Sequence, residues 1–175
     1  MLTTILGYAG LALFFGCLLW AAVNDLCTMK IPNACVLLLL AGFVLVLPAL
    51  PFTWVEVGDA LVVALCVLVA GFVLFMLNVL GAGDGKLFAV LALWLGADGA
   101  QAMLVMAAIF GGVLAMILLA YRRRPLPIAL ITNPVASALH EQDQSMPFAL
   151  AIAPAAAFAL AYSAWAPWVP FITRF

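Results

Sequence analysis

Two aspartates lie at the ends of apolar runs in a chain that carries few charges. The chain has 175 residues, of which 70% are hydrophobic and 7% are charged. Asp25 closes the first apolar run, and Asp84 lies in the segment LGAGDGKL between two others. An ionised carboxylate inside a bilayer is costly and usually serves a function together with a nearby partner. Asp25 and Asp84 are therefore candidates for a functional pair.

Such a pair has a recognisable chemistry. Two carboxyl groups a few ångströms apart cannot easily both ionise, so they share one proton. One of them then acts as a base on a water molecule and the other as an acid, which is the chemistry of aspartic proteolysis and needs no metal or other cofactor. The alternative is that Asp84 forms an interfacial ion pair with Lys86 or caps a helix. Residue types alone leave both interpretations open.

The apolar runs that carry these residues have the lengths of membrane helices. A spanning helix needs about 20 apolar residues, which four segments reach and two do not. The predicted helices are Leu2–Val23, Asn33–Leu50, Ala60–Leu80, Leu87–Ala97, Ala100–Tyr121 and Met146–Trp165. We therefore expect an all-α integral membrane protein, a bundle of six transmembrane helices that forms one domain over residues 1–175. Residues 122–145 are predicted to form a cytosolic loop at the membrane surface.

The fourth predicted helix is short, and its shortness places Asp84 below the membrane surface. If it runs from Asp84 to Ala97, its roughly 14 residues rise about 21 Å. The hydrocarbon core is about 30 Å thick, so Asp84 would lie several ångströms inside its cytosolic edge. The glycines Gly81 and Gly83 beside it permit close approach by another backbone, such as that of a substrate. Trp165 and Trp168 are typical of an interfacial aromatic belt.

Basic residues predict the orientation of the bundle, because they favour the cytosolic side of a membrane. The connections after helices one, three and five hold Lys30, Lys86, Arg122, Arg123 and Arg124. The opposite side holds Arg174, Glu56, Asp59 and Asp98. Both termini are therefore predicted to lie outside, with Asp25 and Asp84 facing the cytosol. The arginines are expected to contact anionic membrane lipid.

Several function classes find no support in the sequence. The net charge is −1 and there is no extended basic stripe, so a nucleic-acid partner is not expected. The four cysteines lack C-x-x-C spacing, and we expect no metal site. His140 is the only histidine, and the sequence after it does not give the H-E-x-x-H pattern of a zinc protease. It lies in the polar loop, away from the bundle interior that a rhomboid-like serine protease would require.

Two motifs resemble those of the type IV prepilin peptidases, which are membrane aspartic peptidases with a G-x-G-D motif. GAGDGK at residues 81–86 is similar to the family pattern G-x-G-D-x-K. NDLCTMKIPN at residues 24–33 is similar to its other signature, an aspartate followed by I-P-N. The segment MPFALAIAPAAA at residues 146–157 looks like the family's helix that opens with proline and an aromatic residue. Presenilin-like enzymes share G-x-G-D, but their first aspartate follows a tyrosine.

The resemblance implies a function and a set of site residues. It implies that Asp25 and Asp84 cleave the leader of type IV prepilins at the cytosolic face of the bacterial inner membrane. Positioning or substrate-binding residues would be Asn24, Lys30, Asn33, Gly81, Gly83 and Lys86. Lys30 stands where the family usually has arginine, which keeps the charge but loses the fork of donors.

The chain lacks the paired C-x-x-C segment of the longer members that also methylate pilins. It therefore looks like the short form of tight-adherence (Flp-type) pili, without methyltransferase activity. The sequence leaves the oligomeric state unknown.

Two other functions remain open at this stage. A small membrane transporter or channel also uses intramembrane acids, although the chain shows no internal inverted repeat. A non-catalytic subunit of a pilus-assembly machine would tolerate the loss of either aspartate. Cleavage of a prepilin is expected of a peptidase but not of a transporter or of a non-catalytic assembly subunit.

Overall fold

The structure is a computed structural model that describes residues 2–49, 53–123, 125, 132–141, 146–163 and 165–166. The described residues form helices joined by turns and loops, with no strand among them, so the all-α prediction is confirmed. The helices are α1 (Leu2–Thr28), α2 (Asn33–Val46), η1 (Leu47–Ala49), α3 (Trp54–Met76), α4 (Ala82–Arg122), α6 (Pro134–His140), α7 (Ala149–Ala159) and η2 (Leu160–Tyr162). Arg124, Trp168 and Arg174 lie outside the described residues.

Three of these helices, α1, α3 and α4, are long and apolar enough to cross a membrane. α2 and the segment Ala149–Tyr162 are apolar but shorter. Large apolar side chains on α3 face outwards, as expected for a helix in contact with lipid; Leu65 and Phe72, for example, are 61% and 60% exposed. These features are those of a helical membrane protein. The count of six membrane spans stays a prediction.

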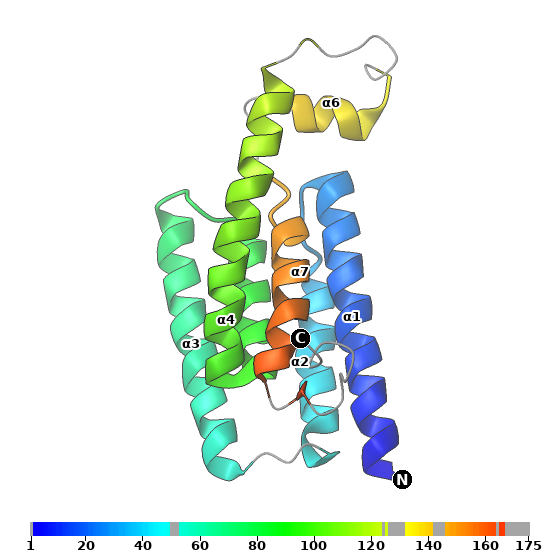
Figure 1. The fold of residues 1–175 in the computed structure, drawn as a ribbon, viewed down its shortest axis with the longest axis vertical. Helices are drawn as coiled ribbons and strands as arrows, with labels where there is room; N and C mark the ends of the chain where they lie inside the picture. Colours follow the sequence, from blue (N-terminus) through cyan, green and yellow to red (C-terminus); the bar gives the residue numbers. More distant parts are fainter. Residues whose placement is uncertain are drawn as a thin grey trace.

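α4 is a hairpin, because its backbone breaks at Gly96. The φ and ψ of Gly96 are 70° and −173°, a conformation that glycine adopts readily and other residues rarely do. In Figure 1 the part of α4 before the break lies behind the part after it, which rises in front of the bundle. The segments 82–95 and 97–122 correspond to the predicted fourth and fifth helices. The first rises only about 21 Å, as expected from the sequence.

The connections from α1 to α2 and from α3 to α4 lie at the same end of the bundle, next to Asp25 and Asp84. α1, α3 and the second segment of α4 run upwards in Figure 1, whereas α2 and α7 run downwards. The second segment of α4 extends beyond the upper ends of α1 and α3 and carries α6. α6 is held there by hydrogen bonds from Tyr121 Oη to the Ala136 carbonyl and from Arg122 Nε to the Leu139 carbonyl.

Several predicted helix ends were wrong. α1 continues beyond Val23 to Thr28, so Asp25 lies inside the helix rather than after it. α3 begins at Trp54, before the predicted Ala60, because Thr53 and Glu56 form a capping box. α2 ends at Val46 and is followed by a short 3-10 turn.

The predicted aromatic belt was wrong for Trp165. Its side chain is fully buried and stacks on Trp94, with ring centroids 5.2 Å apart. Trp165 Nε1 donates to the Trp94 carbonyl, and Trp94 Nε1 donates to the Leu39 carbonyl. These contacts join α2, α4 and the segment after α7. An indole whose N–H finds a buried carbonyl is stable in the core and needs no membrane interface.

Candidate active site

Asp25 lies on the buried face of α1. Leu11, Phe14, Leu18 and Ala21 are buried at helical spacing, and Asp25 is the next residue on that face. Its side chain is 5% exposed, and no other charged residue in the described part of the chain is buried. Asp25 Oδ2 accepts a hydrogen bond of 2.9 Å from the backbone N–H of Ala149, the first residue of α7.

Asp84 lies at the beginning of α4. Gly81 is the N-cap of this helix, and Asp84 occupies its third position. A Cβ atom placed on Gly81 would lie only 2.6 Å from Asp84 Oδ2, so the carboxyl group folds back over the bare Cα of Gly81. An acidic residue at this position is favoured by the free N–H groups of the first helical turn. Because Gly81 has no side chain, the Asp84 carboxyl group can occupy the space beside its Cα atom.

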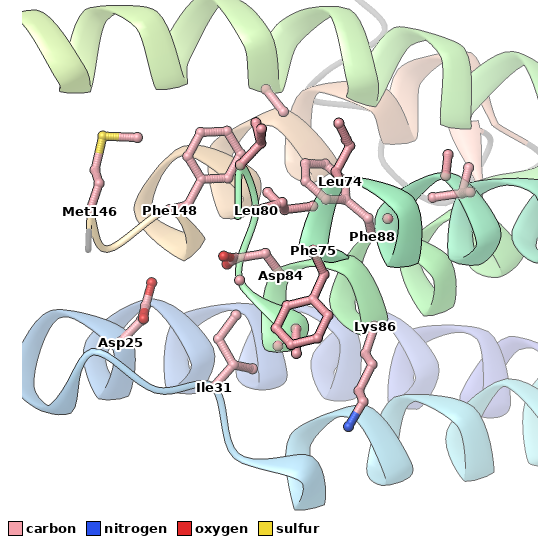
Figure 2. Close-up of a pocket in the computed structure, with 18 of the residues that line it drawn as sticks. Asp25, Ile31, Leu74, Phe75, Leu80, Asp84, Lys86, Phe88, Met146 and Phe148 are labelled. Atoms are coloured by element: carbon pink, nitrogen blue, oxygen red, sulfur yellow. The ribbon is translucent and has the colours of Figure 1, made fainter. Parts of the chain in front are cut away.

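The two carboxyl groups face a shared cavity of about 1020 Å³. Figure 2 shows both directed into the same space, with Ile31 below them and Met146 and Phe148 above. The helices therefore bring together two residues that are far apart in the sequence.

Contacts between the two motif segments hold this arrangement. Lys86 Nζ donates to Asn33 Oδ1 at 3.2 Å, and Figure 2 shows the Lys86 side chain directed away from Asp84. Lys86 therefore tethers the start of α2 to α4 and does not form the ion pair with Asp84 considered above. A Cβ on Gly83 would lie 3.1 Å from Ile31 Cβ, so this glycine allows the loop before α2 to pack against α4.

Asn24 shapes the connection from α1 to α2. Its Nδ2 donates to the Lys30 carbonyl at 2.6 Å and to Thr28 Oγ1 at 3.0 Å. Met29, inside this tight connection, has a φ of 53°. Lys30 takes part through its backbone carbonyl, and both Lys30 and Asn33 line the cavity with Asp25 and Asp84.

Sequence reasoning missed three contributors to the site. Gly71 in α3 packs directly on Gly85, since a Cβ on Gly71 would lie 3.0 Å from Gly85 Cα. A glycine inside a helical pattern was the available signal. Ala149 and Phe148 lie in the segment noted for its proline and aromatic residue, but nothing in residue types indicates that a backbone N–H there binds Asp25.

The rest of the cavity wall is mainly apolar. It is formed by the upper half of α3, the loop that follows, and the second segment of α4, with the side chains of Val67, Ala70, Leu74, Phe75, Leu104, Ala107 and Ala108 among those that line it. Across the described residues, no cluster of three or more His, Cys, Asp or Glu side chains could hold a metal ion. The polar side chains that line the cavity are those of Asp25, Lys30, Asn33, Asn78, Asp84 and Lys86.

Comparison with known families identifies the chain. Residues 12–116, more than half of the chain, match the Type IV leader peptidase family, and the match includes Asp25 and Asp84. No match was found among curated proteins or among solved structures. The family supports a protease of the prepilin leader peptidase kind, acting in a membrane. The chain therefore belongs to the type IV leader peptidase family.

Proposed function

We propose that the chain is an aspartic endopeptidase of six transmembrane helices that removes the leader of type IV prepilins, with Asp25 and Asp84 as its catalytic residues. The observation that carries the proposal is the convergence of these carboxyl groups on one cavity from two different helices. The family match supports the class of substrate. Neither residue has a lysine or arginine partner in the described hydrogen bonds, so both can serve a reaction.

The reaction follows from a pair that shares one proton. The ionised carboxyl group takes a proton from a water molecule, whose oxygen bonds to the carbonyl carbon of the scissile peptide. The protonated carboxyl group supports the developing oxyanion, and a proton is then passed to the leaving nitrogen as the C–N bond breaks. The hydrogen bond from Ala149 fixes the direction of the Asp25 carboxylate during these steps.

The cavity suits an extended peptide that continues into an apolar segment. Gly81 and Gly83 line the cavity beside Asp84, and the space beside their Cα atoms holds the Asp84 carboxyl group and Ile31, so these glycines shape the wall along which a substrate backbone would lie. Beyond the carboxyl groups, the walls formed by α3 and α4 are apolar and include the small residues Ala70 and Ala107. A prepilin offers this combination, since its leader is followed by a hydrophobic helix.

The orientation and subtype are part of the proposal. Lys30 and Lys86 line the cavity that holds the catalytic pair, and Arg122 and Arg123 close α4 at the same end of the bundle, which favours the cytosolic side. We expect both termini to lie on the outer side of the bacterial inner membrane, opposite the cytosol. We also expect a substrate of the Flp type and no methylation of the product.

Co-expression with a Flp-type prepilin, in a host that lacks its own prepilin peptidase, tests the function. The proposal predicts a pilin shortened by its leader, with an unmethylated N-terminus in the intact mass. An unprocessed prepilin beside correctly inserted protein would contradict it. Ion flux through proteoliposomes without cleavage would instead favour a transporter.

A further inference from the structure

The start of α7 determines how Asp25 is held. The first N–H groups of a helix have no partner within the helix and seek one elsewhere. The N–H of Ala149 finds Asp25 Oδ2 at 2.9 Å, and both residues are buried. A displacement of this end of α7 would therefore turn the Asp25 carboxylate or break its hydrogen bond.

Phe148 fixes the start of α7 by packing against a glycine of α4. A Cβ atom on Gly111 would overlap Phe148 Cε2 and lie 2.8 Å from its Cζ, so the ring rests directly on the bare backbone of Gly111. The ring also contacts Phe88, with centroids 6.1 Å apart, and the preceding Pro147 is fully buried. Figure 2 places Phe148 above the two aspartates.

We infer that Phe148, packed on Gly111, is a positioning residue that aims the Ala149 N–H at Asp25. Phe148 belongs to the part of the chain beyond the family match, which ends at residue 116. The inference rests on the proposed function, because it concerns the orientation of a catalytic carboxylate. It adds the start of α7 to the catalytic centre, as the element that orders the centre without reacting itself.

A pair of adjacent glycines provides a matched kinetic test. Gly111→Ala adds a methyl group where the Phe148 ring lies, whereas Gly112→Ala adds one where no atom lies within 4 Å. Gly111 does not line the cavity but the Phe148 ring beside it does, so kcat and KM are determined separately. We expect Gly111→Ala to lower kcat by about 10- to 100-fold, since misplacement of a reacting group by about 1 Å has effects of this size. Gly112→Ala should retain the wild-type kcat.

A double variant tests whether the overlap with the Phe148 ring causes the loss of activity. In Gly111→Ala with Phe148→Leu, the smaller side chain leaves space for the new methyl group, and we expect kcat to recover to within about fivefold of wild type. Because relief of the overlap would also restore a destabilised fold, kcat is compared only among variants that remain folded. Unfolding temperatures of all variants provide the comparison.

A resonance from Ala149 reports the same geometry without any substrate. The chain has three Phe-Ala pairs, Phe88-Ala89, Phe148-Ala149 and Phe158-Ala159. Labelling with carbonyl-13C phenylalanine and 15N alanine therefore selects three amides, and that of Ala159 serves as the internal control because Phe88 contacts the Phe148 ring. The Ala149 amide should shift in Asp25→Asn and in Gly111→Ala, and should return in the double variant.

The outcomes separate this inference from the proposed function. A folded Gly111→Ala variant with wild-type kcat overturns the inference, whether or not the Ala149 resonance moves, while wild-type cleavage still supports the peptidase. If the wild-type protein leaves prepilin uncut, the proposed function fails. An Ala149 amide that is insensitive to Asp25→Asn and Gly111→Ala would then overturn the positioning role as well.

Discussion

Replacing Gly81 by alanine tests whether the geometry of Asp84 sets the rate of cleavage. A Cβ atom at this position would lie 2.6 Å from Asp84 Oδ2. Non-bonded heavy atoms prefer about 3.5 Å, so the carboxyl oxygen must move by roughly 0.6–0.9 Å. Misplacement of this size lowers the rate of a positioned reaction by up to about 100-fold. We therefore expect kcat to fall by about 10- to 100-fold.

The effect of Gly81→Ala should come from the side chain alone. Gly81 has φ −68° and ψ 143°, a conformation that alanine adopts without strain. The unfolding temperature should therefore remain close to that of Gly58→Ala, a control in α3 where a methyl group meets no atom within 4 Å. The assay is steady-state cleavage of a purified prepilin in detergent or nanodiscs, with kcat and KM determined separately. A folded Gly81→Ala enzyme with a kcat within twofold of wild type would refute the reasoning.

Three further predictions concern the scaffold and its orientation. Lys86→Ala and Asn33→Ala should each destabilise the protein, and their double-mutant cycle should show a coupling of about 0.5–1.5 kcal/mol, because they share one hydrogen bond; additive effects would contradict this. Gly71→Val should lower stability by about 1–3 kcal/mol in denaturant unfolding, because its side chain would meet Gly85 of α4; unchanged stability would mean that the two helices do not pack so closely. The exposed thiol of Cys27, near the end of α1, should react with a membrane-impermeant maleimide in inverted vesicles but not in spheroplasts; the reverse pattern would overturn the predicted orientation.

The helices and the candidate pair could be predicted because their signals are local. Apolar runs of membrane length indicate α1, α3 and α4, and Asp25 and Asp84 stand out as charges at the ends of such runs. The ends of helices were less predictable. α1 continues through Asp25, whose buried carboxylate accepts the N–H of Ala149 from another helix, and the residues around Asp25 do not reveal this partner.

The contacts that organise the site could not be predicted because they join distant segments. The partner of Lys86 is the amide of Asn33 rather than the neighbouring Asp84, which depends on how α2 begins beside α4. Trp165 resembles an interfacial residue, yet it stacks in the core because Trp94 and its carbonyl lie where the chain turns after α7. Such pairings depend on packing across the bundle, which a single sequence does not contain.

The central claim, that Asp25 and Asp84 together carry out the cleavage, is tested most directly by Asp25→Asn and Asp84→Asn in the prepilin co-expression assay. An amide has nearly the shape of a carboxyl group but cannot exchange the shared proton, so each variant should insert normally and leave the prepilin uncut. Equal amounts of variant and wild-type protein in the membrane, with similar unfolding temperatures, establish that the fold is retained. Complete processing of the prepilin by either variant would contradict the account.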